Sequence, residues 1–500
     1  MTSTTSSQKR IEKVSSDNIV IGFDLFSNLA YMASLSAARA PRSENIQKAG
    51  QQKELQTSVV FEQVHLLAQR LGIEYTRALQ MVAEKTRSKS IKSLLLRFAS
   101  SIASGESEHV FILEETRIES GRYRNEYEGS LENLKKWTDA YAAMLVSVTL
   151  IVVVGMVSTL LGALGNNFII VVGLSMFFIT SGGVYVIFRT APYEQITYDG
   201  ATDPPPDRAT SKFLLRTLAP MGLLLSLLIG YFFGVGPALI AFGATVYPLG
   251  FFAKRDDNKL AEIDQEVPTF IRSLGTIAGT TITTLSTAMN SLDLESMGSL
   301  KPHVSRLRTR LRNELSPELS WEKFNTETGN ELLRRSTEML VDGVELGGNG
   351  EEVAGIASSY ASTVAELRRK RQLVTSSFAF LVLPMHTAMT GLLLFILQIV
   401  TTFDQKLADV SMGIGSAAIS SATSVTNVPG LEIFKSQDLT LITSMITIVI
   451  IILTISNGLA TKFASGGHNL KIGAAIGLTS MISGINMIVV PTLASAFLGT

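Results

Sequence analysis

The sequence contains no cysteine and little charge, and each shortage excludes a class of protein. None of its 500 residues is cysteine, so disulfides, zinc knuckles, iron–sulfur clusters and thiol nucleophiles are excluded. Asp, Glu, Lys and Arg make up 17% of the residues and sum to zero net charge. A soluble chain averages about 25% charged residues. The neutral balance also removes the electrostatic argument for a nucleic-acid-binding protein.

Motifs for catalysis and cofactor binding are missing as well. The chain has no phosphate-binding loop, no H-E-x-x-H zinc motif and no G-x-S-x-G nucleophile elbow, and its five His residues are scattered. The run 347–350, GGNG, suggests a phosphate cradle, but Glu351 and Glu352 follow at once and would repel an anion. We interpret this run as a sharp turn before a helix. The sequence therefore predicts no enzyme, no cofactor and no metal site.

Long apolar runs are what the sequence has instead. A membrane-crossing helix needs about 20 mostly apolar residues. Seven runs without Asp, Glu or Lys meet this requirement, at 140–164, 168–188, 213–233, 236–252, 376–401, 439–459 and 472–498. Buried helices of soluble proteins rarely run so long without a charged residue. The sequence predicts an all-α, polytopic membrane protein. Because the fourth run is short and contains two prolines, six or eight spans are alternatives.

The positive charges predict the orientation of these spans, because Lys and Arg favour the cytoplasmic side. With the N-terminus inside, all but two of the 43 Lys and Arg residues lie on the inner side, and the exceptions are Lys406 and Lys435. We therefore expect a multi-pass plasma-membrane protein with a cytoplasmic N-terminus and an external C-terminus. Residues 1–20 are polar, so we expect no signal peptide.

This topology divides the chain into alternating cytoplasmic and membrane parts. The expected parts are a disordered N-terminus at 1–16, a first cytoplasmic helical domain at 17–139, four membrane helices within 140–253 with a cytoplasmic linker at 189–212, a second cytoplasmic helical domain at 254–373, and three membrane helices within 374–500 with an irregular external loop at 403–437. Both cytoplasmic domains show helical spacing of apolar residues, and glycines such as Gly72 and Gly105 mark helix ends. Their similar order predicts a duplicated helical bundle.

Two groups of basic residues are candidates for contacts. Four arginines at alternate positions flank a helical apolar stripe of Leu307, Leu311 and Leu315, namely Arg306, Arg308, Arg310 and Arg312. They form either a solvated helix rim or a basic surface for an acidic partner domain. A second group directly before the fifth apolar run consists of Arg368, Arg369, Lys370 and Arg371. We interpret this group as a membrane anchor that touches anionic headgroups.

His386 lies inside the fifth apolar run, where an ionisable residue is a functional hint. No apolar run contains Asp or Glu that would relay a proton. We therefore expect His386 to pack and to form hydrogen bonds. The same absence argues against a transporter coupled to protons or cations, which normally needs carboxylates near the middle of the membrane.

Several stretches, in their order and topology, resemble the type II secretion F family, and within it the membrane platform proteins of the archaellum, the archaeal flagellum. The stretch 267–289, VPTFIRSLGTIAGTTITTLSTAM, is similar to the family's first helix pair, and 318–324, ELSWEKF, to the short segment after the paired helices. The stretch 344–372 is similar to its acidic, Gly-rich turn and last long helix. The stretches 67–79 and 126–147 match more loosely.

This resemblance implies a non-enzymatic platform in the bilayer beneath an archaellum or type IV pilus-like filament of pilin-like subunits. Its partner would be a cytoplasmic hexameric ATPase, whose conformational work is coupled to subunit insertion or filament rotation, and the analogy allows a homodimer. We place the expected ATPase contact at Arg306, Arg308, Arg310, Arg312, Glu345, Glu351 and Glu352. The alternatives are a transporter or channel with regulatory cytoplasmic domains, and a membrane receptor that signals through its cytoplasmic helices.

Overall fold

The computed structural model describes residues 18–160, 166–198, 204–281, 283–295, 297–419 and 439–498. Within these ranges the regular structure is helical, apart from an isolated bridge between Thr197 and Asn330. The protein is an all-α polytopic membrane protein, as the sequence predicts. The expected disordered N-terminus, 1–16, lies outside the described residues.

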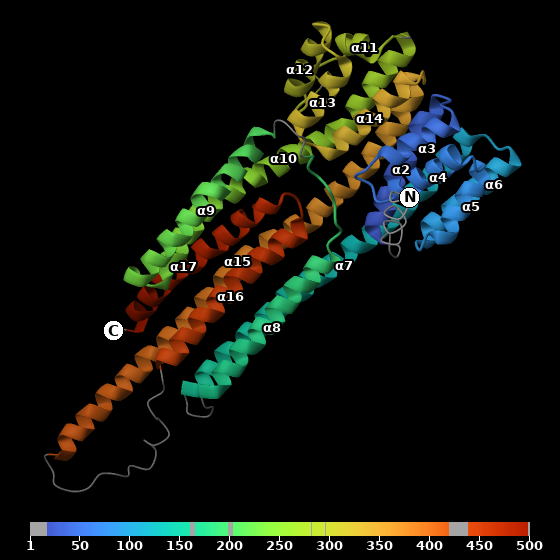
Figure 1. Cartoon of the computed structure of the whole chain (residues 1–500). Coiled ribbons are helices and arrows are strands. Elements are labelled where there is room, and N and C mark those ends of the chain that lie inside the picture. Colours follow the sequence, from blue (N-terminus) through green and yellow to red (C-terminus); the bar gives the residue numbers. More distant parts are fainter. Residues whose placement is uncertain are drawn as a thin grey trace. The chain divides into compact units, whose positions relative to one another are not determined.

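The chain forms two compact units (Figure 1). Unit 1 comprises Met1–Leu131, Pro192–Pro205 and Asp256–Arg371, and unit 2 comprises Glu132–Ala191, Pro206–Arg255 and Gln372–Thr500. Both stretches expected to be cytoplasmic, 17–139 and 254–373, contribute most of their residues to unit 1. The division of these stretches into two duplicated domains stays a prediction.

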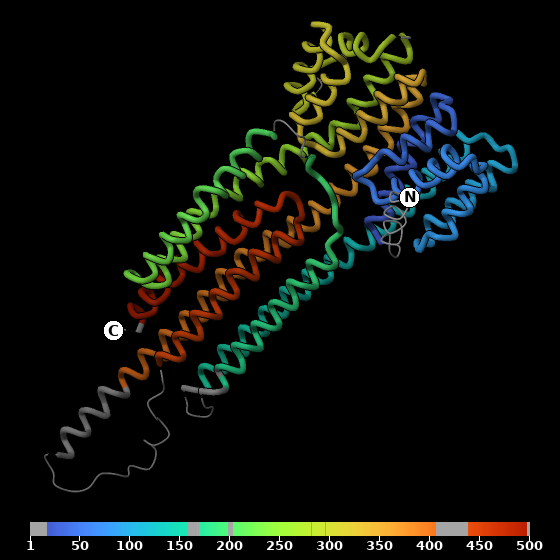
Figure 2. The backbone as a smooth tube through the Cα atoms, viewed as in Figure 1, coloured from blue at the N-terminus to red at the C-terminus, as the bar shows by residue number. Residues whose placement is uncertain are grey.

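The short helices belong to unit 1, and three long helices have residues in both units. Unit 1 contains α2 (Ile19–Ala37), α3 (Arg42–Gln51), α4 (Ser58–Leu71), α5 (Tyr75–Lys85), α6 (Lys89–Ser104), α11 (Leu285–Ser291), α12 (Lys301–Arg312), α13 (Pro317–Thr328) and α14 (Glu331–Glu345). The long helices are α7 (Glu108–Leu160), α10 (Val235–Thr281) and α15 (Gly350–Ile419), and Figure 2 traces α7 and α10 each as a continuous coil. Unit 2 also contains α8 (Asn166–Thr190), α9 (Pro206–Phe233), α16 (Leu439–Ser465), the 3-10 turn η1 (Asn469–Lys471) and α17 (Ile472–Leu498).

Helix ends are largely where the sequence predicts them. Gly72 and Gly105 end α4 and α6 in the left-handed conformation, with φ of 64° and 74°, which glycine adopts without steric penalty. The predicted apolar stripe through Leu315 is wrong at its last member. Helix α12 ends at Arg312, Glu314 turns the chain with φ of 57°, and Leu315 is left exposed.

Eight helices are long and apolar enough to cross a membrane by length and composition. Seven of them overlap the seven predicted runs, and the eighth is α2. In α2, 78% of the apolar window is buried inside the protein, against 11–44% in the other seven. Helix α2 also buries Asp24 and Asn28 among protein atoms. We therefore treat α2 as a core helix of unit 1 and the other seven as membrane helices.

Helix α2 joins two hydrophobic cores of unit 1. Ile21, Leu25 and Leu29 pack on one side with residues of α3, α4, α5 and α6. Phe26 and Ala30 pack on the other side with residues of α10, α14 and α15. Burying a large apolar side chain contributes roughly 1.5–3 kcal/mol, so a helix that is apolar on two faces stabilises both cores.

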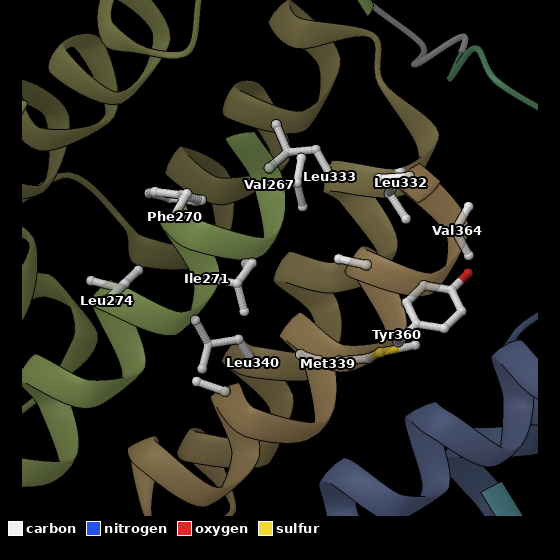
Figure 3. Close-up of a cluster of buried hydrophobic side chains, with 14 of the residues drawn as sticks. Val267, Phe270, Ile271, Leu274, Leu332, Leu333, Met339, Leu340, Tyr360 and Val364 are labelled. Atoms are coloured by element: carbon white, nitrogen blue, oxygen red, sulfur yellow. The ribbon is translucent and has the colours of Figure 1, made fainter. Parts of the chain in front are cut away.

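The second of these cores forms where three helices meet (Figure 3). Its labelled side chains include Val267, Phe270, Ile271 and Leu274 of α10, Leu333, Met339 and Leu340 of α14, and Tyr360 and Val364 of α15. All of them are 0–2% exposed. The α10 part of the stretch 267–289, which resembles the first helix of a pair, therefore supplies one wall of this core.

Two segments differ from the expected loops. Helix α15 continues through Ile419, so the first part of the expected irregular loop at 403–437 is helical, and residues 420–437 lie outside the described residues. Residues 403–419 contain no proline, so nothing in them stops the helix. Helix α9 begins at Pro206, inside the expected linker 189–212, because proline is favoured in the first turn of a helix.

In unit 2, α10 and α17 approach each other along two rows of glycine. The rows are Gly236, Gly243 and Gly250 on α10 and Gly473, Gly477 and Gly484 on α17. A Cβ atom added to Gly250 would lie 1.8 Å from the backbone nitrogen of Ala474. One added to Gly243 would lie 2.6 Å from the carbonyl oxygen of Gly477. The two backbones are therefore in contact, as small residues permit in membrane helix pairs.

We predict that Gly250→Ala destabilises unit 2, because the added methyl group would overlap the backbone of α17. Overpacking of this kind costs about 1–3 kcal/mol. Thermal unfolding of the detergent-solubilised protein should show a lower midpoint. The matched control is Gly182→Ala in α8, where an added Cβ meets no atom within 4 Å. Equal midpoints for the two variants would contradict the close backbone contact.

Candidate functional site

Arg308, in the predicted arginine face of α12, is engaged inside unit 1. Its Nε donates to the carbonyl oxygen of Met289 at 2.9 Å, and its guanidinium also donates to the carbonyl of Leu292. These two acceptors lie at the end of α11 and just after it. Arg308 therefore ties α12 to the end of α11 and is half-buried in doing so.

Arg306 and Arg310 share an acidic partner, Glu327 on α13. The Nε atom of Arg306 lies 3.4 Å from the Glu327 carboxylate, and Arg310 pairs with the same carboxylate. Arg306 is nevertheless exposed, as is Arg312, which has no ion pair within the described ranges. Burial and the nearby charge of Arg306 lower the pKa of His303 to about 4, so His303 adds no charge at neutral pH. Arg306 and Arg312 are the two exposed members of the four candidate arginines on α12.

The predicted acidic contact residues lie at the turn between α14 and α15. Glu345 is exposed at the end of α14, and Glu351 and Glu352 occupy the exposed first turn of α15. The side chain of Asn349 accepts a hydrogen bond from the backbone N–H of Glu351 at 2.9 Å. The run 347–350 is thus the sharp turn that the sequence predicts. Within the described residues, no ion pair joins these acids to the α12 arginines.

A buried ion cluster on α14 was not predicted. Glu331 is 1% exposed, and its carboxylate accepts hydrogen bonds from Arg334 and Arg335, each at 2.6 Å. Arg334 also donates to Glu338 at 2.6 Å and pairs with Glu54, which precedes α4. Burial would raise the pKa of Glu331, but the hydrogen bonds and charges of the two arginines outweigh it and lower that pKa below 4.5.

The cluster also holds aromatic rings from distant parts of the sequence. The guanidinium carbon of Arg334 lies 5.0 Å from the ring centre of Tyr198, and that of Arg335 lies 5.3 Å from the ring centre of Phe23. A guanidinium over an aromatic face is attracted by the ring quadrupole. The sequence signal was available, since charges at 331, 334, 335 and 338 share one side of an apolar helix. Their partners on α2, before α4 and after α8 are not local and were not foreseeable.

Residues 192–198, which we call the strap, follow α8 and are fastened to unit 1. Arg371 donates to the carbonyl oxygen of Pro192 at 2.6 Å, and Arg368 donates to that of Gln195 at 3.0 Å. The strap then pairs with the chain before α14, through the bridge between Thr197 and Asn330. The expected linker, 189–212, is therefore part of unit 1 over these residues.

The predicted membrane-anchor group has two buried members. Arg368 bonds the Asp264 carboxylate at 3.0 Å, and Arg371 lies 3.5 Å from that of Glu194. Lys370 pairs with Glu128 at 2.6 Å and with Glu366 at 3.0 Å, whereas Arg369 is exposed. Contact of this group with lipid headgroups stays a prediction.

His386 lies in a closed polar network inside unit 2. The Asn457 amide donates to its Nδ1 at 3.0 Å. Because Nδ1 accepts, Nε2 carries the proton in the neutral ring and donates to the Ser483 hydroxyl at 2.8 Å. The Tyr141 hydroxyl donates to the Asn457 carbonyl oxygen at 3.0 Å. The network joins α7, α15, α16 and α17, and His386 is the hydrogen-bonding histidine that the sequence predicts.

The described residues hold no group of three or more His, Asp or Glu side chains that could bind a metal ion.

Comparisons with known proteins find two curated relatives. The chain is 24% identical to Flagella accessory protein J of Methanococcus voltae over 330 residues, which cover 63% of this chain and 59% of the relative. It is 22% identical to Flagella accessory protein J of Methanocaldococcus jannaschii over 321 residues, which cover 62% and 57%. The matched region spans less than two thirds of either relative.

No family model matches the chain, and no solved structure matches it. The resemblance to the type II secretion F family as a whole therefore stays a prediction. The resemblance to an archaeal flagellar protein, by contrast, is supported by both relatives.

We predict that Glu331→Gln destabilises unit 1 by about 3–5 kcal/mol, because it leaves Arg335 buried without a carboxylate. Denaturant unfolding followed by the fluorescence of Trp321, which is buried in unit 1, measures this after Trp137→Phe removes the other tryptophan. Because the folded-state pKa of Glu331 is lowered, its contribution is full above pH 4.5 and is lost as the pH falls through that pKa. As the pH falls through that pKa, the difference in unfolding free energy between the variant and the wild type should therefore become smaller.

The control for this variant is Glu62→Gln on α4, at an exposed position, which should change stability by less than about 0.5 kcal/mol. Equal unfolding of the two variants would show that the α14 cluster adds nothing to stability.

We predict that His386→Leu lowers the stability of unit 2 by about 1–3 kcal/mol, because Asn457 and Ser483 each lose one hydrogen bond inside an apolar unit. Thermal unfolding in detergent is the measurement. Thr492→Val is the matched control, since the Thr492 hydroxyl is exposed and bonds only within its own helix. An unchanged midpoint for His386→Leu would mean that the network contributes no stability.

Proposed function

We propose that this chain is a membrane platform for the assembly of an archaeal flagellum. The observation that carries the proposal is the likeness to two relatives that are both named Flagella accessory protein J, over about three fifths of each chain. The all-α polytopic fold is compatible with a scaffold of this kind. In this proposal the chain itself performs no catalysis, and a cytoplasmic hexameric ATPase supplies the energy.

Unit 1 faces the cytoplasm in this proposal, with the N-terminus inside and the C-terminus outside. The pilin-like filament subunits would meet the membrane helices of unit 2. Helices α7, α10 and α15 support a mechanical role, because each has residues in both units. A helix shared by two units can pass a displacement from one to the other.

The ATPase contact combines the exposed arginines of α12 with the acids at the turn between α14 and α15. Arg306 and Arg312 supply accessible positive charge, and Glu345, Glu351 and Glu352 supply accessible negative charge. Arg308 and Arg310 hold the surface in place through their bonds to the end of α11 and to Glu327. Complementary charges would orient an approaching partner and determine its register.

We predict that the double variant Arg306→Glu/Arg312→Glu abolishes co-purification of the ATPase and leaves membrane insertion intact. Both side chains are exposed, so their reversal should not unfold unit 1. The matched control is Arg70→Glu/Arg87→Glu, which makes the same change in charge. Arg70 is exposed in the last turn of α4, and Arg87 is exposed between α5 and α6. Undiminished co-purification would remove the site assignment.

The second candidate function, a transporter or channel, is tested on the same purified protein. Reconstitution into vesicles should give no flux of small ions above that of empty vesicles, because the polar groups around His386 bond one another and no carboxylate lies in the seven apolar runs. Flux that His386→Leu removes would favour the transporter over the platform.

A further inference from the structure

A groove of about 870 Å³ lies within unit 1, and the residues that line it are distinct from those of the proposed ATPase contact. Its long walls come from α10 and α15, and α7 and the turn after α11 close its rim. Ser273 and Thr276 line it from α10, and Gly355, Ser359 and Ser362 line it from α15. On each helix these positions are three, four or seven residues apart, so each set occupies one helix face.

The groove has hydrogen-bonding capacity that the described part of the chain leaves unused. The hydroxyls of Ser273, Thr276, Ser359 and Ser362 make no hydrogen bond to described residues, and neither does the guanidinium of Arg272. Arg272 directly precedes Ser273 on α10 and is exposed. A neutral or cationic occupant would leave this charge without a counter-ion.

The remaining charges of the lining are already engaged. Arg124 lies 3.3 Å from the Glu366 carboxylate, and Asp293 accepts a hydrogen bond from the backbone N–H of Glu295 at 2.9 Å. The unused charge of the groove is therefore positive, and a carboxylate would complement it.

Gly355 indicates the shape of the occupant. It lies in the interior of α15, where glycine is less favourable than alanine by roughly 1 kcal/mol. An added Cβ would meet nothing within 4 Å, so packing within the described chain does not require glycine. A missing side chain on the floor of a groove lets another backbone approach closely. The positions from Gly355 to Ser362 cover about two helical turns.

We propose that this groove binds a helix of a soluble protein partner, which inserts Asp or Glu side chains toward Arg272 and lays its backbone over Gly355. A lipid headgroup is a poor match, because Arg272 lies twenty residues along the chain from Phe252, where the fourth apolar run ends. The proposal rests on the cytoplasmic placement of unit 1 in the proposed function, and it holds for any partner that presents such a helix.

The test is photo-crosslinking of the full-length chain in the membranes of its own cells. Benzoylphenylalanine replaces Ser291, an exposed residue on the rim of the groove, and mass spectrometry maps the adduct. The expected adduct is a helix of a second protein that carries Asp or Glu. Arg272→Glu should abolish it, and replacing the mapped partner acid by Arg should restore it.

A pair of glycine variants tests whether the groove itself is occupied. Gly355→Leu should lower the adduct yield about tenfold, equivalent to 1.4 kcal/mol of binding, because the side chain fills the groove. The matched control is Gly129→Leu on the exposed face of α7, where an added Cβ also meets nothing within 4 Å, and it should leave the yield unchanged.

Three results overturn the proposal: an adduct with lipid or with a second copy of this chain, no adduct, or a yield that Gly355→Leu does not change. Failure of the proposed function is detected separately. The chain has no native cysteine, so Gly129→Cys creates a single thiol. Labelling of that thiol by an impermeant maleimide in intact cells would place unit 1 outside and contradict the platform, not only the groove.

Discussion

Unit 1 depends on the ion cluster that α14 buries around Glu331. Arg334 and Arg335 share this carboxylate. Arg334 also pairs with Glu54 and lies over the Tyr198 ring, and Arg335 lies over the Phe23 ring. Buried charges of this kind are tolerated only when every member is paired, so the segments that supply the partners must all be in place together. The first helices of the chain, the strap and α14 are thereby joined in one cooperative structure. Helix α12 and the start of α15, with their exposed charged residues, belong to the same unit.

Much of the fold follows from local patterns, and the exceptions have physical reasons. Long uncharged runs identify seven helices because lipid requires them, and glycine after an apolar run stops α4 and α6 because only glycine turns left at no penalty. Helix α2 escaped prediction because protein covers both of its apolar faces, so it lacks the one-sided pattern of a surface helix. The end of α12 depends on Glu314 in a left-handed conformation, which no propensity predicts.

The sequence identifies which charged residues are candidates for contacts, but it does not predict the partners that they bond. Arg368 and Arg371 precede a membrane run, which is the usual place of a headgroup anchor. Arg368 nevertheless bonds Asp264, 104 residues away, and Arg371 donates to the Pro192 carbonyl. Arg308 looks like its neighbours on α12, yet two carbonyls of another segment bind it. The run 347–350 and His386 were interpreted correctly, because a turn before a helix is determined by its own residues and an isolated polar side chain in an apolar run must find partners.

The glycine rows of α10 and α17 restrict how this sequence can diverge. Where backbones touch, every replacement adds atoms, so at Gly250 and Gly243 no conservative substitution exists. Neighbouring lipid-facing positions such as Leu224 and Phe232 on α9 can exchange among apolar residues freely, because lipid accommodates any shape. Distant relatives of this chain should therefore retain glycines spaced by seven residues in the helix that corresponds to α10, and by four and seven in the one that corresponds to α17. That spacing identifies the helix pair where overall sequence identity is low.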